Sequence, residues 1–129
     1  MNAGYRPGVA KILVVDDDQD IQRLLAVRLA REGHEVAFAA DGISAIASAR
    51  REQPQLILLD VGLPAGDGFT VLERLHAIPQ LAAIPVIVMS ARDSHETVER
   101  ALEAGAERFV PKPFEMDELL AAVRAVLAS

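Results

Sequence analysis

The chain has 129 residues, 51% of them hydrophobic, and its 13 Lys and Arg against 19 Asp and Glu give a formal net charge of −6. This length and apolar content support one domain with a single core, which excludes disorder, and the absence of cysteine excludes disulfides and thiolate metal sites. The acidic surplus and an aromatic content of only 4% argue against direct nucleic-acid binding.

The first nine residues contain Gly and Pro and are predicted to form a flexible tail, followed by a folded domain over residues 10–129. The tail has no hydrophobic signal core, and no apolar run in the chain reaches membrane-spanning length. Together with the absence of cysteine, these features predict a cytoplasmic protein without membrane insertion.

Short apolar runs rich in β-branched residues alternate with segments of helical periodicity after this tail. The runs predict five strands, at residues 11–15, 34–38, 56–59, 86–89 and 108–110. Run 56–59 is apolar throughout, as expected for a strand that is covered on both faces. The apolar faces of four predicted helices contain Ile21, Leu24, Leu25 and Leu29; Ile43, Ile46 and Ala47; Phe69, Leu72 and Leu75; and Leu119, Leu120, Val123, Val126 and Leu127.

Capping residues mark where some of these helices begin and end. Asp18 and Asp20 are interpreted as caps of the first helix, because Asp commonly caps a helix that follows a strand. Asp93, with Glu96 three residues later, resembles a capping box that opens the fourth helix, and Gly105 is predicted to close that helix.

Five strands that alternate with five helices indicate right-handed crossover connections between parallel strands. The predicted fold class is therefore α/β, a doubly wound parallel sheet with helices on both faces. The last helix reaches the end of the chain, so we expect no output domain and a protein that acts as a single module.

In a doubly wound sheet, ligands bind at the carboxyl ends of the strands, near the point where the strand order reverses. The polar residues that follow the predicted strands are Asp16, Asp17, Asp18, Asp60, Ser90 and Lys112. We therefore expect three or four carboxylates, one hydroxyl and one ammonium to lie together at one edge of the sheet.

Crowded carboxylates repel one another, which raises the pKa of at least one of them unless a cation neutralises the group. Oxygen ligands without His or Cys favour a hard ion, and an incomplete set that leaves room for water and phosphate favours Mg2+. A turn or cap role is the alternative for any single acid, and we prefer it for Asp18 and Asp20. For the other acids and the lysine, the shared edge favours a functional site.

The chain resembles the receiver domain of bacterial two-component response regulators over residues 10–128, in particular stand-alone receivers of the chemotaxis-regulator kind. The motifs that carry the resemblance are Val14-Val15-Asp16-Asp17-Asp18, Leu58-Leu59-Asp60, Leu63-Pro64 with Asp67-Gly68, Met89-Ser90-Ala91 and Lys112-Pro113-Phe114. The resemblance implies a flavodoxin-like sheet with strand order 2-1-3-4-5 and five helices.

The resemblance also implies a phosphoacceptor, Asp60, which takes a phosphoryl group from a sensor histidine kinase or a histidine phosphotransfer protein. Asp17, Asp60 and the backbone carbonyl of Gly62 would hold Mg2+ directly, with Mn2+ as a substitute. Asp16 would act mainly through bound water.

Other residues would contact the phosphoryl group or respond to it. Lys112 would contact one phosphoryl oxygen, and the Ser90 hydroxyl and the Ala91 amide would donate hydrogen bonds to others. Pro113 would follow the lysine through a cis peptide bond. Phosphorylation would draw Ser90 inward and let Phe109, at the family's switch position, fill the vacated space. The face made by the fourth helix, fifth strand and fifth helix would then change shape and regulate an unknown protein partner.

Some positions depart from the family's pattern. Gly62 and Arg92 flank the route of the water that attacks the phosphoryl group, so we expect them to affect the lifetime of the phosphorylated state. Glu107 and Arg108 stand where members that form a common symmetric dimer carry paired aspartates, so we expect a monomer or a weak homodimer.

Two alternative functions stay open at this point. Asp16 and Asp18 fit the D-x-D pattern of a haloacid-dehalogenase-type phosphohydrolase, with Ser90 and Lys112 as later partners, although the chain has no segment for a cap. The second alternative is a degenerate receiver that serves only as a docking module. The primary interpretation is a signalling receiver, which is not an enzyme beyond catalysing its own phosphorylation and dephosphorylation.

Overall fold

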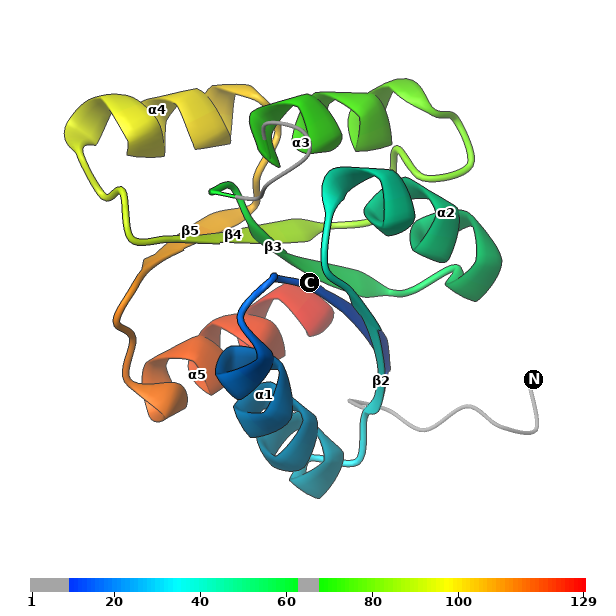
Figure 1. Cartoon of the computed structure of the whole chain (residues 1–129), viewed down its shortest axis with the longest axis vertical. Helices are drawn as coiled ribbons and strands as arrows, with labels where there is room; N and C mark the ends of the chain where they lie inside the picture. Colours follow the sequence, from blue (N-terminus) through cyan, green and yellow to red (C-terminus); the bar gives the residue numbers. More distant parts are fainter. Residues whose placement is uncertain (1–9, 63–67) are drawn as a thin grey trace.

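The computed structural model describes residues 10–62 and 68–129, in which five β-strands alternate with five α-helices (Figure 1). The elements are β1 (Lys11–Val15), α1 (Gln19–Arg31), β2 (Glu35–Ala39), α2 (Gly42–Glu52), β3 (Leu56–Asp60), α3 (Gly68–Ala77), β4 (Val86–Ser90), α4 (His95–Glu103), β5 (Arg108–Pro111) and α5 (Met116–Leu127). Among the described residues, no helix combines the length and apolar character that a membrane span requires. The predicted tail at residues 1–9 and the motif residues Leu63, Pro64 and Asp67 lie outside the described residues.

All five strands are parallel and form one sheet in the order β2-β1-β3-β4-β5, which confirms the predicted doubly wound fold. The chain passes from β1 to β2, crosses to β3 on the other side of β1 and continues through β4 to β5. The strand order therefore reverses between β1 and β3, and the carboxyl ends of these two strands lie side by side.

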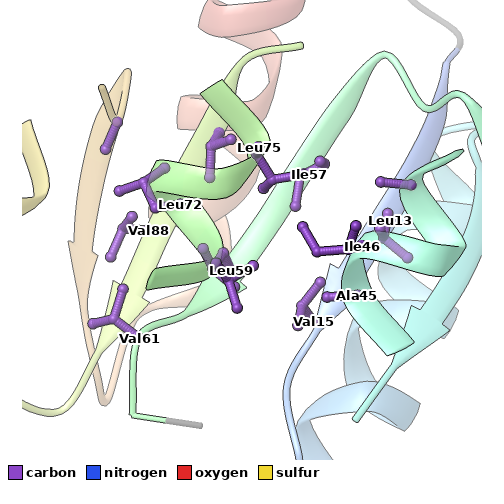
Figure 2. Packing of buried hydrophobic residues seen from close by; sticks show 14 of the residues in the cluster. Leu13, Val15, Ala45, Ile46, Ile57, Leu59, Val61, Leu72, Leu75 and Val88 are labelled. Carbon is purple, nitrogen blue, oxygen red and sulfur yellow. The ribbon is translucent and has the colours of Figure 1, made fainter. Parts of the chain in front are cut away.

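Helices cover both faces of the sheet, with α2, α3 and α4 on one face and α1 and α5 on the other (Figure 1). Alternate strand residues contribute to two hydrophobic clusters; in β1, Leu13 faces the first cluster and Val14 faces the second. Figure 2 shows the first cluster, where Ile46 of α2 and Leu72 of α3 pack against the sheet. Every residue of β3 and β4 is buried, so both faces of these two central strands are covered by helices.

Four strands extend one residue beyond their predicted ends, so Ala39, Asp60, Ser90 and Pro111 belong to β2, β3, β4 and β5. Asp60 and Ser90 were expected to follow their strands as the polar residues at the strand ends. Strand pairing depends on backbone groups, however, and Asp60 pairs with Met89 of the neighbouring strand. The polar side chains therefore start from the rigid sheet itself.

The predicted start of the second strand at residue 34 is wrong, since β2 begins at Glu35. The N–H of His34 donates to the carbonyl of Leu29 and closes α1. The buried His34 ring accepts a hydrogen bond from the N–H of Ala10 through Nδ1, at 2.9 Å. Burial lowers the pKa of His34, which favours the neutral ring that this acceptor role requires.

Apolar residue type alone did not predict which helix positions are buried. Leu24 is 47% exposed and Ile43 is 73% exposed, and Ala47 is also exposed, so their predicted places on the buried faces are wrong. In α1 the fully buried residues are Leu25 and Leu29, and Leu24 lies about 100° around the helix from Leu25.

The capping predictions are correct for Asp18 at α1 and wrong for Asp20 and for the start of α4. Asp18 is the N-cap of α1 and accepts hydrogen bonds from two backbone N–H groups, whereas Asp20 lies in the first turn without capping it. The N-cap of α4 is Ser94 rather than Asp93, because the Ser94 side chain accepts the hydrogen bond from the first turn. Gly105 follows the helix with a φ of 106°, which confirms its predicted terminating role.

Gly68 begins α3 in close contact with the backbone that follows β3. A Cβ atom at this position would lie 2.2 Å from the Cα of Val61, and the backbone cannot move aside as a flexible side chain could.

We expect Gly68→Ala to lower the free energy of unfolding by about 2 kcal/mol, because overpacking outweighs the better helix propensity of Ala. Ala47→Gly, on the exposed side of α2, measures the propensity effect alone and should lower it by about 1 kcal/mol. Urea denaturation measures both values. A Gly68→Ala protein as stable as the wild type would contradict the close contact.

Candidate functional site

The register of the sheet places two carboxylates at the same level on neighbouring strands. Val15 of β1 pairs with Leu59 of β3, so the residues that follow them are Asp16 and Asp60. Because the strand order reverses between β1 and β3, this is the edge position where doubly wound sheets bind ligands.

The ends of β4 and β5 add a hydroxyl and an ammonium to this edge. Ser90 pairs with Pro111, and the N–H of the next residue, Lys112, donates to the Ser90 carbonyl at 2.8 Å. The peptide bond between Lys112 and Pro113 is cis, as the resemblance implied. The hydrogen bond from its N–H to Ser90 anchors the backbone of the lysine to the end of β4.

The ammonium of Lys112 bonds to both carboxylates. Its Nζ atom lies 2.6 Å from Oδ2 of Asp16 and 3.2 Å from Oδ2 of Asp60. Burial lowers the pKa of Lys112. The hydrogen bonds and negative charges of the two acids raise this pKa by more than burial lowers it, so it lies above its ordinary value. The acids therefore keep the lysine protonated.

Asp16 has no exposed surface, and both of its carboxylate oxygens have partners. Oδ1 accepts a hydrogen bond from the N–H of Asp18 at 2.9 Å, and Oδ2 accepts the bond from Lys112. Burial raises the pKa of Asp16, whereas the bonds from Lys112 and Asp18 lower it and the charge of Asp60 raises it slightly. The pKa of one crowded acid is therefore raised, but burial and not the predicted repulsion between acids is the main cause.

Asp60 is buried in the sheet but remains accessible, since 12% of its side chain is exposed. Its Oδ1 accepts a hydrogen bond from the N–H of Gly62 at 2.8 Å, and its Oδ2 accepts the bond from Lys112. A Cβ at position 62 would lie 3.3 Å from Oδ1, so glycine leaves this oxygen uncrowded. Each oxygen keeps a further lone pair for another contact.

Asp17 completes a cluster of three acids. Carboxylate oxygens of Asp16, Asp17 and Asp60 all lie within 4.8 Å of one another. Asp17 is exposed, and no described residue donates a hydrogen bond to its carboxylate. Three carboxylates beside one ammonium leave excess negative charge, and an all-oxygen donor set fits a hard divalent cation such as Mg2+.

Ser90 and Ala91 lie beside this cluster. Ser90 is 1% exposed, and its Oγ accepts a hydrogen bond from the N–H of Arg92 at 3.0 Å. The hydroxyl hydrogen can still donate to a further group. Ala91 is exposed and lines a pocket together with Lys112 and Phe114.

Phe109, the predicted switch residue, is half-buried on β5, where it pairs with Val88 of β4. It packs against the cluster that contains Val88 of β4 and Ala101 of α4. This packing gives Phe109 a core role, and its part in switching stays a prediction.

The structure separates Asp18 from the other acids, in agreement with its predicted cap role, and adds a residue that the sequence motifs did not indicate. Asp18 lies outside the three-acid group, because its carboxylate caps α1. Gln22, on the first turn of α1, donates a hydrogen bond from Nε2 to the backbone carbonyl of Asp16 at 2.6 Å. The motifs at the strand ends do not include Gln22, because it lies on a helix. The only signal in the sequence for its contact with the loop is its position one turn after the N-cap Asp18.

Comparisons with known proteins agree with this arrangement. The chain matches the model of the response regulator receiver domain over residues 12–124. RpaA of Synechocystis, a DNA-binding dual master transcriptional regulator, is 41% identical over 117 residues, which are 91% of this chain and 48% of RpaA. The chain spans about half the length of the first curated relatives that it matches.

Two solved structures are similar over nearly their whole length. The chemotaxis response regulator CheY4 of Vibrio cholerae has 30% identity and a TM-score of 0.86, with 92% of this chain and 98% of CheY4 covered. The receiver domain of the sensor histidine kinase PA1611 of Pseudomonas aeruginosa has 31% identity and a TM-score of 0.85, with 93% and 98% covered. That structure has a magnesium ion coordinated in the active site cleft.

The phosphohydrolase alternative is not supported, because its second acid, Asp18, is used as a helix cap and the matches are to receivers. The strand order, the acids and lysine at the sheet edge and the matches agree, and the chain belongs to the family of response regulator receiver domains, the modules of phosphorylation-based two-component signalling.

Proposed function

We propose that Asp60 is the phosphoacceptor and that its donor is a phosphohistidine of a sensor histidine kinase or a histidine phosphotransfer protein. One observation carries the proposal: among the described acids, only Asp60 combines contact with Lys112 and access from solvent. Asp16 contacts Lys112 but has no exposure, and Asp17 is exposed but has no hydrogen bond from Lys112.

The proposed reaction uses the charges that already surround Asp60. An oxygen of its carboxylate attacks the phosphorus in line with the P–N bond of phosphohistidine. A P–O bond forms as the P–N bond breaks, and the imidazole nitrogen leaves with the bonding electrons and takes up a proton. Lys112, the Ser90 hydroxyl and the Ala91 N–H stabilise the negative charge on the phosphoryl oxygens.

The proposed cation is Mg2+, with Mn2+ as a substitute, held by Asp17, Asp60 and the carbonyl of Gly62 and contacted by Asp16 through water. When bound, the ion neutralises charge on the acids and on the transferring phosphoryl group. The close oxygens of three acids support this proposal, as does the magnesium in the similar PA1611 receiver domain.

The proposed output is a change in the face formed by α4, β5 and α5, which then regulates a protein partner. Phosphorylation draws the Ser90 hydroxyl toward the phosphoryl group, and the Phe109 ring follows into the vacated space. We propose that the receiver domain covers residues 10–129, acts in the cytoplasm as a monomer or weak homodimer, and turns over no substrate other than its own phosphoryl group.

Incubation with acetyl phosphate and Mg2+ should add the mass of one phosphoryl group to the intact chain. Asp60→Asn should abolish this addition, because the amide is a poor nucleophile. Asp117→Asn, whose side chain is 97% exposed at the start of α5, is the matched control and should be phosphorylated like the wild type. Intact-protein mass spectrometry measures all three, and phosphorylation of Asp60→Asn would show that another residue is the acceptor.

Lys112→Met should lower the free energy of unfolding by about 3 kcal/mol at neutral pH in metal-free buffer, because it leaves Asp16 and Asp60 without their counter-charge. The difference from the wild type should shrink as the pH falls toward the raised pKa of Asp16, since protonated acids need no counter-charge. It should also shrink above pH 10.5, as Lys112 deprotonates through its raised pKa.

Urea denaturation of both proteins at about pH 4, about pH 7 and about pH 11 measures these differences. A difference that does not change with pH would mean that Lys112 stabilises the protein by packing and not by its charge.

A further inference from the structure

Gln22, on the first turn of α1, is bonded twice to the loop that follows β1. Its side-chain Nε2 donates to the carbonyl of Asp16 at 2.6 Å, and its backbone N–H donates to the carbonyl of Asp18 at 3.0 Å. The side chain is half-buried. One residue of α1 therefore binds the carbonyls on both sides of Asp17.

The bond to the Asp16 carbonyl restrains the peptide group that carries Asp17. This carbonyl and the N–H of Asp17 belong to one planar unit, so a donor held against the carbonyl fixes the plane of the unit. On its other side, Asp16 is held by the bond from its N–H to the carbonyl of Ala39 at 3.1 Å. The next peptide is held as well, because the N–H of Asp18 donates to Oδ1 of Asp16 at 2.9 Å. Gln22 is the side chain that holds the carbonyl of the peptide between these two points.

Side-chain contacts do not fix the Asp17 carboxylate. The carboxylates of Asp16 and Asp60 are held by Lys112 and by backbone N–H groups. The Asp17 side chain is exposed and receives no hydrogen bond from a described residue. The direction of its Cα–Cβ bond, which the backbone sets, is therefore the main restraint on where its oxygens lie relative to the other two acids.

We infer that Gln22 is a positioning residue for the Asp17 carboxylate in the divalent-cation site. The inference rests on the proposed function, because it requires that Asp17 binds the cation there. Gln22 contacts neither the cation nor the phosphoryl group and acts through the backbone of Asp16. Groups that orient a ligand in this indirect way commonly change metal affinity tenfold or more when they are lost.

A purely structural role for the same hydrogen bond predicts a different result. Loss of a donor to a half-buried carbonyl lowers stability whether or not the bond orients Asp17. Gln53 offers a control for the loss of a side-chain bond to a backbone carbonyl, because its Nε2 donates to the carbonyl of Arg50 at 3.1 Å at an exposed position. Gln53 follows α2 just before β3 begins, at the opposite edge of the sheet from the acids.

The experiment titrates Mg2+ into the wild type, Gln22→Met and Gln53→Met while 1H–15N NMR spectra are recorded. We expect the dissociation constant for Mg2+ to rise about tenfold in Gln22→Met and to stay unchanged in Gln53→Met. The same spectra report whether each variant is folded. Gln22→Ala also lacks the donor but favours the helix, and it should weaken Mg2+ binding as much as Gln22→Met does.

Phosphorylation by acetyl phosphate gives a second measurement. Gln22→Met should need about tenfold more Mg2+ for half of its maximum rate and should reach the wild-type rate at saturating Mg2+. Wild-type Mg2+ affinity in both Gln22 variants would overturn the positioning role and leave the proposed function intact. Equal weakening in Gln53→Met would also overturn it, and a wild type that binds no Mg2+ would overturn the proposed cation site as well.

Discussion

The contact between the Lys112 ammonium and the buried carboxylate of Asp16 is the interaction on which the site depends. A carboxylate without exposed surface is costly unless a cation and hydrogen bonds compensate it, and Asp16 has both. The lysine lies 96 residues away in the sequence, so the contact also joins the first and last strand ends of the fold. Because the same ammonium bonds to Asp60, one positive charge makes the crowding of two acids tolerable.

The sheet supplies the positions that this charge arrangement needs. Reversal of the strand order between β1 and β3 makes the two acid-bearing strands neighbours, and their register sets Asp16 and Asp60 at one level. The next two strands continue the same edge with Ser90 and, through the anchored backbone after β5, with Lys112. Since β3 and β4 are covered on both faces by helices, the packed core keeps their ends in register.

Much of this could be predicted from the sequence, because the strand runs and the polar residues at their ends are local features. An apolar run such as 56–59 predicts a buried strand, and alternation with helices predicts parallel strands, whose carboxyl ends lie at one edge of the sheet. The order of the strands came from the family resemblance. Helix phase was less predictable: Leu24 is apolar yet exposed, since burial depends on which side of α1 meets the sheet. The bond from Gln22 to Asp16 was not predictable, because it depends on the angle at which the helix leaves the loop.

The three acids differ in exposure and in the contacts that hold them, and these differences support their proposed roles more sharply than residue type does. Asp16 has both carboxylate oxygens bonded and no exposure, so it has no access for a transferred group and serves to fix the lysine. Asp60 receives one donor on each oxygen and keeps both a free lone pair and an exposed edge, which a nucleophile requires. Asp17 is exposed and receives no hydrogen bond from a described residue, so in the proposed site its oxygens can turn toward the cation and their position depends on the backbone. The proposed cation site, although built on a rigid sheet, thus still depends on one helix residue, Gln22, to position the acid that no side chain holds.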